Sequence, residues 1–197
     1  MGRFFSCTRT FMAALAIAAP TGLTYQAEAA SHRAPTGTYV DWDNNFYLQV
    51  KAAPGKKNVI IIHGIVDENG HGIVHVFDDG DAVTGPLGNR DINIPADANV
   101  FRVNVEAGDE DDRVYNFTGL RPTLHGGPGN DYLYSGSTAD KMWGDGGDDK
   151  LDSRSHSDVL FGGSGNDIID GGDGDDDADG EAGNDTCINV ETTVSCD

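Results

Sequence analysis

The chain has 197 residues and a formal net charge of −20, because 33 acidic side chains outnumber 13 lysine and arginine side chains. A surface this acidic repels nucleic-acid phosphates, which argues against nucleic acid as a partner. The length allows one domain, or two small ones, with a modest hydrophobic core.

The first 29 residues have the pattern of an export signal. Arg3 and Arg9 precede an apolar run over residues 11–19. The later sequence Ala27-Glu28-Ala29 matches a signal-peptidase cleavage site. The apolar run is too short to stay in a bilayer, so no membrane span is expected. We therefore predict a signal peptide at 1–29 and a secreted mature chain that starts at Ala30. A buried amino-terminal helix is the alternative.

Residues 30–106 are predicted to be a strand-rich β region. Apolar β-formers cluster at 46–50, 59–66, 73–77 and 100–105, and turn-forming residues separate them. No long helical period interrupts the pattern.

Three histidines in this region, His63, His71 and His75, form the one cluster outside the repeats that could bind a transition metal. His71 and His75 would stand roughly 13 Å apart along one strand, too far to share an ion, so zinc is the lesser possibility. The sequence contains no H-E-x-x-H, G-x-S-x-G or phosphate-loop motif. We therefore predict no catalytic residue and no organic cofactor.

A degenerate copy of the nine-residue repeat that begins at residue 126 is expected at 107–115. This stretch contains Gly108, has Asp112 at its sixth position and has Val114 at its eighth position. It would be the first coil or the cap of the structure that follows. In that case it would share a continuous core with the region before it.

From residue 126 to residue 188 the chain keeps a nine-residue register. The sixth position is always aspartate, at Asp131, Asp140, Asp149, Asp158, Asp167, Asp176 and Asp185. The eighth position is apolar, at Leu133, Met142, Leu151, Leu160, Ile169, Ala178 and Cys187. Glycines permit a tight turn, aspartate supplies an anionic oxygen, and the apolar side chain points inward from a short strand.

The repeat resembles the RTX (haemolysin-type) calcium-binding nonapeptide family. The resemblance implies turns of six residues that hold Ca²⁺, strands of three residues, and two nonapeptides in each coil of a parallel β-roll. The expected fold is therefore all-β, with a parallel β-roll, a calcium-binding solenoid, at 107–188 (clear repeats at 126–188). The strand-rich region precedes it, and a carboxy-terminal cap at 189–197 follows.

The resemblance also implies the metal ligands. Carboxylates and exposed backbone carbonyls suit Ca²⁺, and stacked turns eighteen residues apart would share each ion. The predicted site residues are Asp131, Asp149, Asp167, Asp185, Asp176, Gly127, Gly129, Gly144, Gly147, Gly163, Gly165 and Gly183. Two turns of the alternate column, 135–140 and 153–158, lack these glycines, so few or no ions are expected there.

Removal of the signal peptide would also remove Cys7 and leave the pair Cys187 and Cys196. In an oxidising compartment we expect these two residues to form a disulfide, with two free thiols as the alternative.

Residues 126–197 carry eighteen acidic and three basic side chains, a net charge of −15. Such a segment is expected to be disordered until cations neutralise it. The predicted function is that of a secreted, non-enzymatic calcium-binding protein whose roll folds outside the cell, in a structural or surface-adhesive role. Its partner at the cell surface or in the extracellular matrix is unknown. A small extracellular hydrolase or lyase with an RTX folding module is the alternative.

Overall fold

The computed structural model describes residues 39–42, 47–52, 54–66, 72–78, 91–94 and 102–196. The predicted signal peptide at 1–29 lies outside the described residues, as does the histidine at position 71. Within the described ranges, no helix has the length and apolar character that a membrane span requires.

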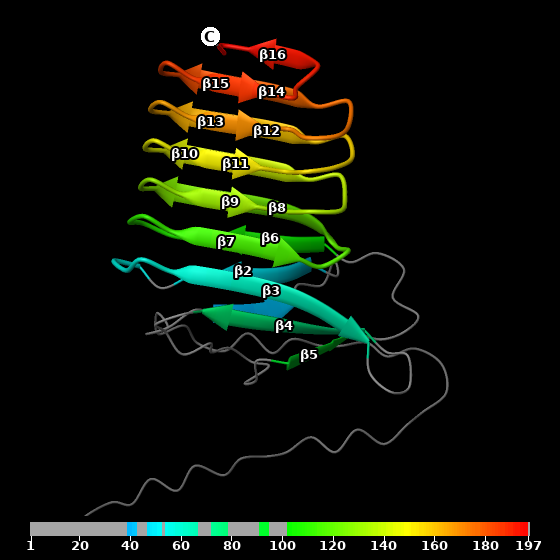
Figure 1. Ribbon diagram of the computed structural model, residues 1–197. Coiled ribbons are helices and arrows are strands. Elements are labelled where there is room, and N and C mark those ends of the chain that lie inside the picture. The colour runs from blue at the N-terminus through cyan, green and yellow to red at the C-terminus, as the bar shows by residue number, and fades with distance from the viewer. Residues whose placement is uncertain are drawn as a thin grey trace, which may run out of the picture.

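The described strands form two sheets. The first sheet contains, in spatial order, β1 (Tyr39–Trp42), β2 (Tyr47–Lys51), β6 (Arg102–Glu106), β8 (Arg121–Pro128), β10 (Lys141–Gly146), β12 (Val159–Ser164), β14 (Asp177–Ala182) and β16 (Thr192–Val194). The second sheet contains β15 (Thr186–Ile188), β13 (Ile168–Asp170), β11 (Lys150–Asp152), β9 (Tyr132–Tyr134), β7 (Arg113–Phe117), β3 (Val59–Val66), β4 (Gly72–Asp78) and β5 (Asp91–Ile94). From β6 onward the chain alternates between the two sheets as it climbs toward the carboxy terminus (Figure 1).

The repeat region is a parallel β-roll. Met142 of β10 pairs with Leu124 of β8 and with Leu160 of β12, so equivalent residues lie eighteen positions apart. The second sheet has the same offset, since Leu151 pairs with Leu133 and Ile169. Each coil therefore consists of two nonapeptides, one strand in each sheet, as the sequence predicts. The all-β roll prediction is confirmed.

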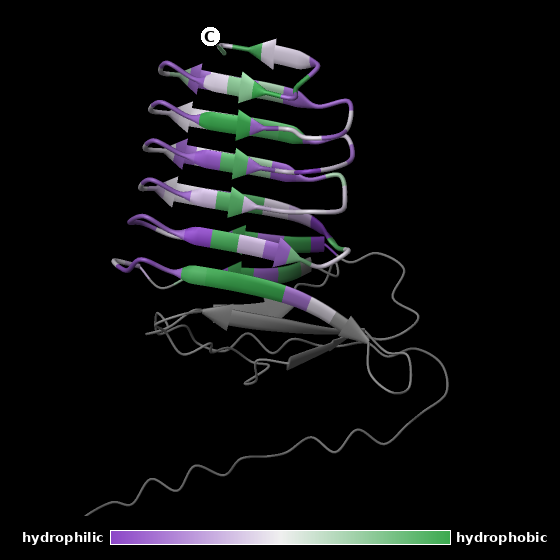
Figure 2. Ribbon diagram, in the orientation of Figure 1, coloured by the Kyte–Doolittle hydropathy of each residue, from purple (hydrophilic) through white to green (hydrophobic). Residues whose placement is uncertain are grey.

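The core consists of inward side chains stacked along the roll axis. The three-residue strands β9, β11 and β13 each contribute a buried middle residue, and the alternation of exposure along β9 and β11 follows from the pleat. The buried apolar side chains of the roll are Ala107, Val114, Leu124, Leu133, Met142, Leu151, Leu160, Ile169 and Ala178. Figure 2 shows these inward positions as hydrophobic bands that recur from coil to coil.

Parallel pairing continues below residue 107. β2 pairs with β6, β6 with β8, β3 with β7, and β7 with β9. The antiparallel pairs among the described strands are β1–β2, β3–β4 and β4–β5. One buried cluster contains Leu48 and Ala178 alike, so the strand-rich region and the roll share a core. The division of the chain at residue 107 stays a prediction.

The last coil is closed by the carboxy-terminal segment. Cys187 and Cys196 form a disulfide with Cα atoms 5.7 Å apart, and the partly buried Cys187 packs against the core. Closing a loop this short contributes about 2–3 kcal/mol by restricting the unfolded chain.

Candidate metal sites in the turns

The six-residue turns stack in two columns, one along each side of the roll (Figure 1). The first column consists of the turns 107–112, 126–131, 144–149, 162–167 and 180–185. The second column consists of the turns 135–140, 153–158 and 171–176.

The sixth-position aspartates are buried in both columns and use one carboxylate oxygen to join successive turns. Oδ1 of Asp149 accepts the N–H of Asp131 at 2.7 Å, and Oδ1 of Asp167 accepts the N–H of Asp149 at 2.8 Å. In the second column, Oδ1 of Asp158 accepts the N–H of Asp140 at 2.8 Å. This ladder orients each carboxylate without any metal.

The second carboxylate oxygen, Oδ2, is buried and has no hydrogen-bond partner among the described residues in any of the seven repeats. The residues concerned are Asp131, Asp140, Asp149, Asp158, Asp167, Asp176 and Asp185. A buried anionic oxygen without a donor costs about 1–3 kcal/mol or more, so a whole row of them indicates a cationic ligand.

The glycines let carbonyl groups of one turn approach the next. Gly147 and Gly165 both have φ of 133°, and a Cβ on either would collide with a carbonyl oxygen of the turn below, that of Gly129 and Gly147 respectively. The predicted residues Gly127, Gly129, Gly163 and Gly183 lie against carbonyl oxygens in the same way. Gly144, at the first position of its turn, instead faces Oδ2 of Asp149 and the carbonyl oxygen of Gly162.

These groups fit Ca²⁺. The ion takes six to eight oxygen ligands, and two stacked turns bring together carboxylate and carbonyl oxygens. Within the described part of the chain, no three His, Cys, Asp or Glu side chains converge as a cluster that could hold a metal.

Residues 123–151 and 153–187 match the family model of the RTX calcium-binding nonapeptide repeat, in four copies. These are RTX repeats. The match covers about a third of the chain. Neither the search of curated proteins nor the search of solved structures found a significant match.

The two ends of the RTX columns use residues outside the repeat. At the lower end of the first column, the N–H of buried Asn58 donates to Oδ1 of Asp112 at 2.6 Å. At the upper end of the second column, Oε2 of Glu191 accepts the N–H of Asp176 at 2.8 Å. Asn58 and Glu191 thus continue the aspartate ladder. Neither stands in the nine-residue register, so the repeat pattern alone does not reveal them.

In the second RTX column, the backbone conformation is closer to that of an intact turn than the sequence suggests. The prediction of few ions there depended on the loss of glycines from the turns 135–140 and 153–158. In the structure, Arg154 and His156 adopt φ of 73° and 85°, values that favour glycine. The turn 153–158 therefore keeps the two left-handed residues of an intact turn.

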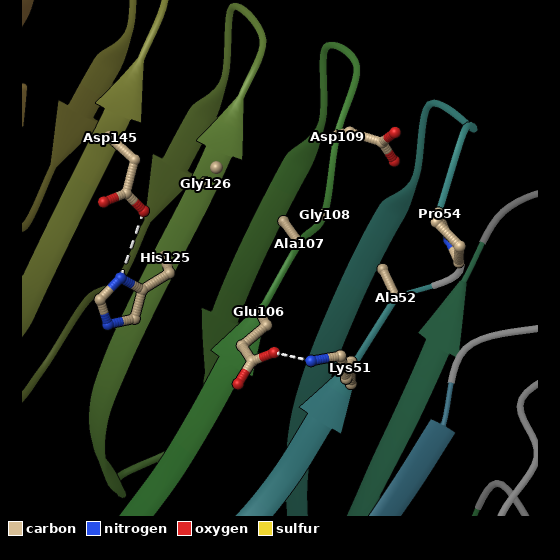
Figure 3. A pocket seen from close by; sticks show the side chains of 11 residues that line it. Lys51, Ala52, Pro54, Glu106, Ala107, Gly108, Asp109, His125, Gly126 and Asp145 are labelled. Atoms are coloured by element: carbon tan, nitrogen blue, oxygen red, sulfur yellow. Dashed lines mark hydrogen bonds and ion pairs between the residues drawn. The ribbon is translucent and has the colours of Figure 1, made fainter. Parts of the chain in front are cut away.

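A groove of about 510 Å³ lies beside the lower turns of the first column. Figure 3 shows His125 turned toward Asp145, with Nδ1 and Oδ2 3.2 Å apart, and Glu106 paired with Lys51. The described residues that line the groove include no serine, threonine or cysteine beside this pair.

The ion-free turns make calcium binding sensitive to pH. Burial raises the pKa of Asp131 and Asp149 to about 7, and the charges of neighbouring aspartates add to this, although backbone N–H groups oppose it. Because the folded pKa exceeds the ordinary value, the ion-free roll gains stability as pH falls from about 7 toward 4, while protons compete with Ca²⁺.

We expect Ca²⁺ affinity, measured by calorimetric titration of the mature protein, to fall about tenfold from pH 7.5 to pH 5.5. An affinity equal at the two values would show that these carboxylates do not give up protons to the ion.

Proposed function

We propose that the protein is a secreted, non-enzymatic calcium-binding protein whose RTX roll folds when it meets Ca²⁺ outside the cell. The observation that carries this proposal is the row of buried Oδ2 oxygens without hydrogen-bond partners, one in each repeat, beside carbonyl oxygens of the next turn. A cation that bridges two turns satisfies both groups and offsets the like charges stacked along the roll.

The ligands that we propose lie mainly in the first column. Its four repeat turns would hold about three bridging ions between them, since each ion needs two turns. The proposed carboxylate ligands are Asp131, Asp149, Asp167 and Asp185, with Asp176 in the second column, where Oδ2 of Asp176 and the carbonyl oxygen of Asn189 lie beside Gly171. Backbone groups at Gly127, Gly129, Gly144, Gly147, Gly163, Gly165 and Gly183 would let the turns approach the ions.

A structural or surface-adhesive role follows from how the roll depends on the ion. The complete site requires two stacked turns and so does not exist in the unfolded chain, which makes binding and folding one equilibrium. Where Ca²⁺ is scarce the chain would remain unfolded and pass through an export machinery, and where it is plentiful the chain would fold. A hydrolase or lyase that carries an RTX folding module is not favoured.

Circular dichroism of the mature protein, residues 30–197, tests this function. We expect addition of millimolar Ca²⁺ to produce a large gain of β-structure, and chelation to reverse it. Mg²⁺ should substitute poorly, because it prefers a smaller octahedral shell and keeps its waters. A spectrum that chelator leaves unchanged would contradict calcium-dependent folding. A broad screen of hydrolase and lyase substrates on the calcium-loaded protein tests the alternative.

A further inference from the structure

The first residue of each turn controls access to the space between two coils. Gly162 has no side chain, and a Cβ there would lie 2.4 Å from Oδ2 of Asp167 and 2.9 Å from the carbonyl oxygen of Gly180. Gly144 has the equivalent surroundings, formed by Asp149 and Gly162. In the intact turns, glycine thus leaves a carboxylate oxygen and a carbonyl oxygen facing the same space, as a bridging cation requires.

Serine occupies this first position in the turn 153–158. Ser153 is fully buried, and its hydroxyl donates to the carbonyl oxygen of Gly171 at 2.9 Å. That carbonyl belongs to the first residue of the next turn, so it corresponds to the Gly162 and Gly180 carbonyls of the first column. The hydroxyl also lies beside the Asp158 carboxylate. Burial raises the pKa of Asp158 to about 7, and the neighbouring Asp140 N–H and Ser153 hydroxyl oppose that shift.

The rest of this turn has what a cation site needs. The carbonyl oxygens of Arg154 and His156 lie against Gly172 and Gly174, as in the first column. Oδ2 of Asp158 is buried without a hydrogen-bond partner among the described residues.

The positive charge of Arg154 is directed elsewhere. Its Nε lies 3.2 Å from Oδ1 of Asp152, and its guanidinium lies over the ring of Tyr134, 5.1 Å from the centroid. The guanidinium therefore engages groups on the second sheet. The hydroxyl of Ser153 is what distinguishes this turn from an intact one.

We propose that the Ser153 hydroxyl takes the place of a calcium ion between the turns 153–158 and 171–176, and that this single side chain closes a metal site that is otherwise complete. The inference depends on the proposed calcium-binding function and adds which residue decides where ions bind. Hydrogen bonding by the serine would hold these two turns together without metal, so this part of the second column would not need Ca²⁺ to order.

Ser153→Gly tests the proposal through the number of bound ions. We expect the variant to bind one Ca²⁺ more than the natural chain, measured by native mass spectrometry and by equilibrium dialysis at saturating Ca²⁺. Ser157→Gly is the matched control, because Ser157 is an exposed residue of the same turn and its hydroxyl is not at the first position. Its ion count should equal that of the natural chain. The converse change, Gly162→Ser in the first column, should remove one ion while circular dichroism in excess Ca²⁺ still shows a folded roll.

The outcomes separate this inference from the function on which it depends. If the natural chain binds Ca²⁺ but Ser153→Gly binds the same number of ions, the proposal is wrong and the function stands. A lower count in Ser153→Gly would mean that the hydroxyl is itself a ligand, which also overturns the proposal. If Ser153→Gly does not fold, an unchanged count in Gly162→Ser still overturns it. No Ca²⁺ binding by the natural chain would overturn the proposed function and this inference together.

Discussion

Asp149→Asn is expected to raise the Ca²⁺ concentration at the folding midpoint at least about tenfold, which corresponds to about 1.4 kcal/mol or more. The amide oxygen of asparagine can still accept the N–H of Asp131, which Oδ1 of Asp149 now accepts at 2.7 Å. The change therefore keeps the ladder between turns and removes the negative charge and the Oδ2 ligand. Circular dichroism followed during a Ca²⁺ titration gives the midpoint.

Asp158→Asn is the matched control in the second column. Oδ1 of Asp158 accepts the N–H of Asp140 at 2.8 Å, so the same substitution has the same effect on the ladder. Because we propose no ion at this junction, its calcium midpoint should stay within about twofold of the natural chain. Equal shifts in the two variants would contradict a roll that binds its ions mainly in the first column.

Leu160→Ala is expected to destabilise the calcium-loaded roll by about 2–5 kcal/mol, since it leaves a cavity in a continuous core. Leu160 is fully buried, and its strand neighbours in register are Met142 and Ala178. Ala178 is too small to fill the space, and the stacked coils cannot close around it without breaking register. The free energy of unfolding comes from urea titration in saturating Ca²⁺.

Val159→Ala supplies the comparison for this core variant. Val159 precedes Leu160 in β12 but points outward and is only partly buried, so its loss should cost less than about 1 kcal/mol. If both variants lost the same stability, the inward and outward faces of β12 would not differ as the structure indicates.

The sequence by itself predicts the coil and its main site residues. The nine-residue register fixes a turn followed by a strand because each unit contains its own glycines, aspartate and inward apolar residue. Leu151 could thus be placed in the core and Asp149 in a turn before any contact was known. The offset of eighteen then follows from two units in each coil, and the structure shows it in every pair of roll strands from β8 to β15.

The tertiary structure alone shows how the roll begins, how its second column ends and which side chains join successive turns. Asn58 donates to an aspartate 54 residues away, and Glu191 ends the second column from outside the register. The sequence marks the turn 153–158 as defective because residues with side chains, among them Arg154 and His156, replace its glycines. In the folded chain those residues adopt the required backbone, and the Ser153 hydroxyl reaches the Gly171 carbonyl of the next coil. A local pattern cannot reveal such contacts, because a hydrogen bond between coils depends on which residues stacking brings face to face.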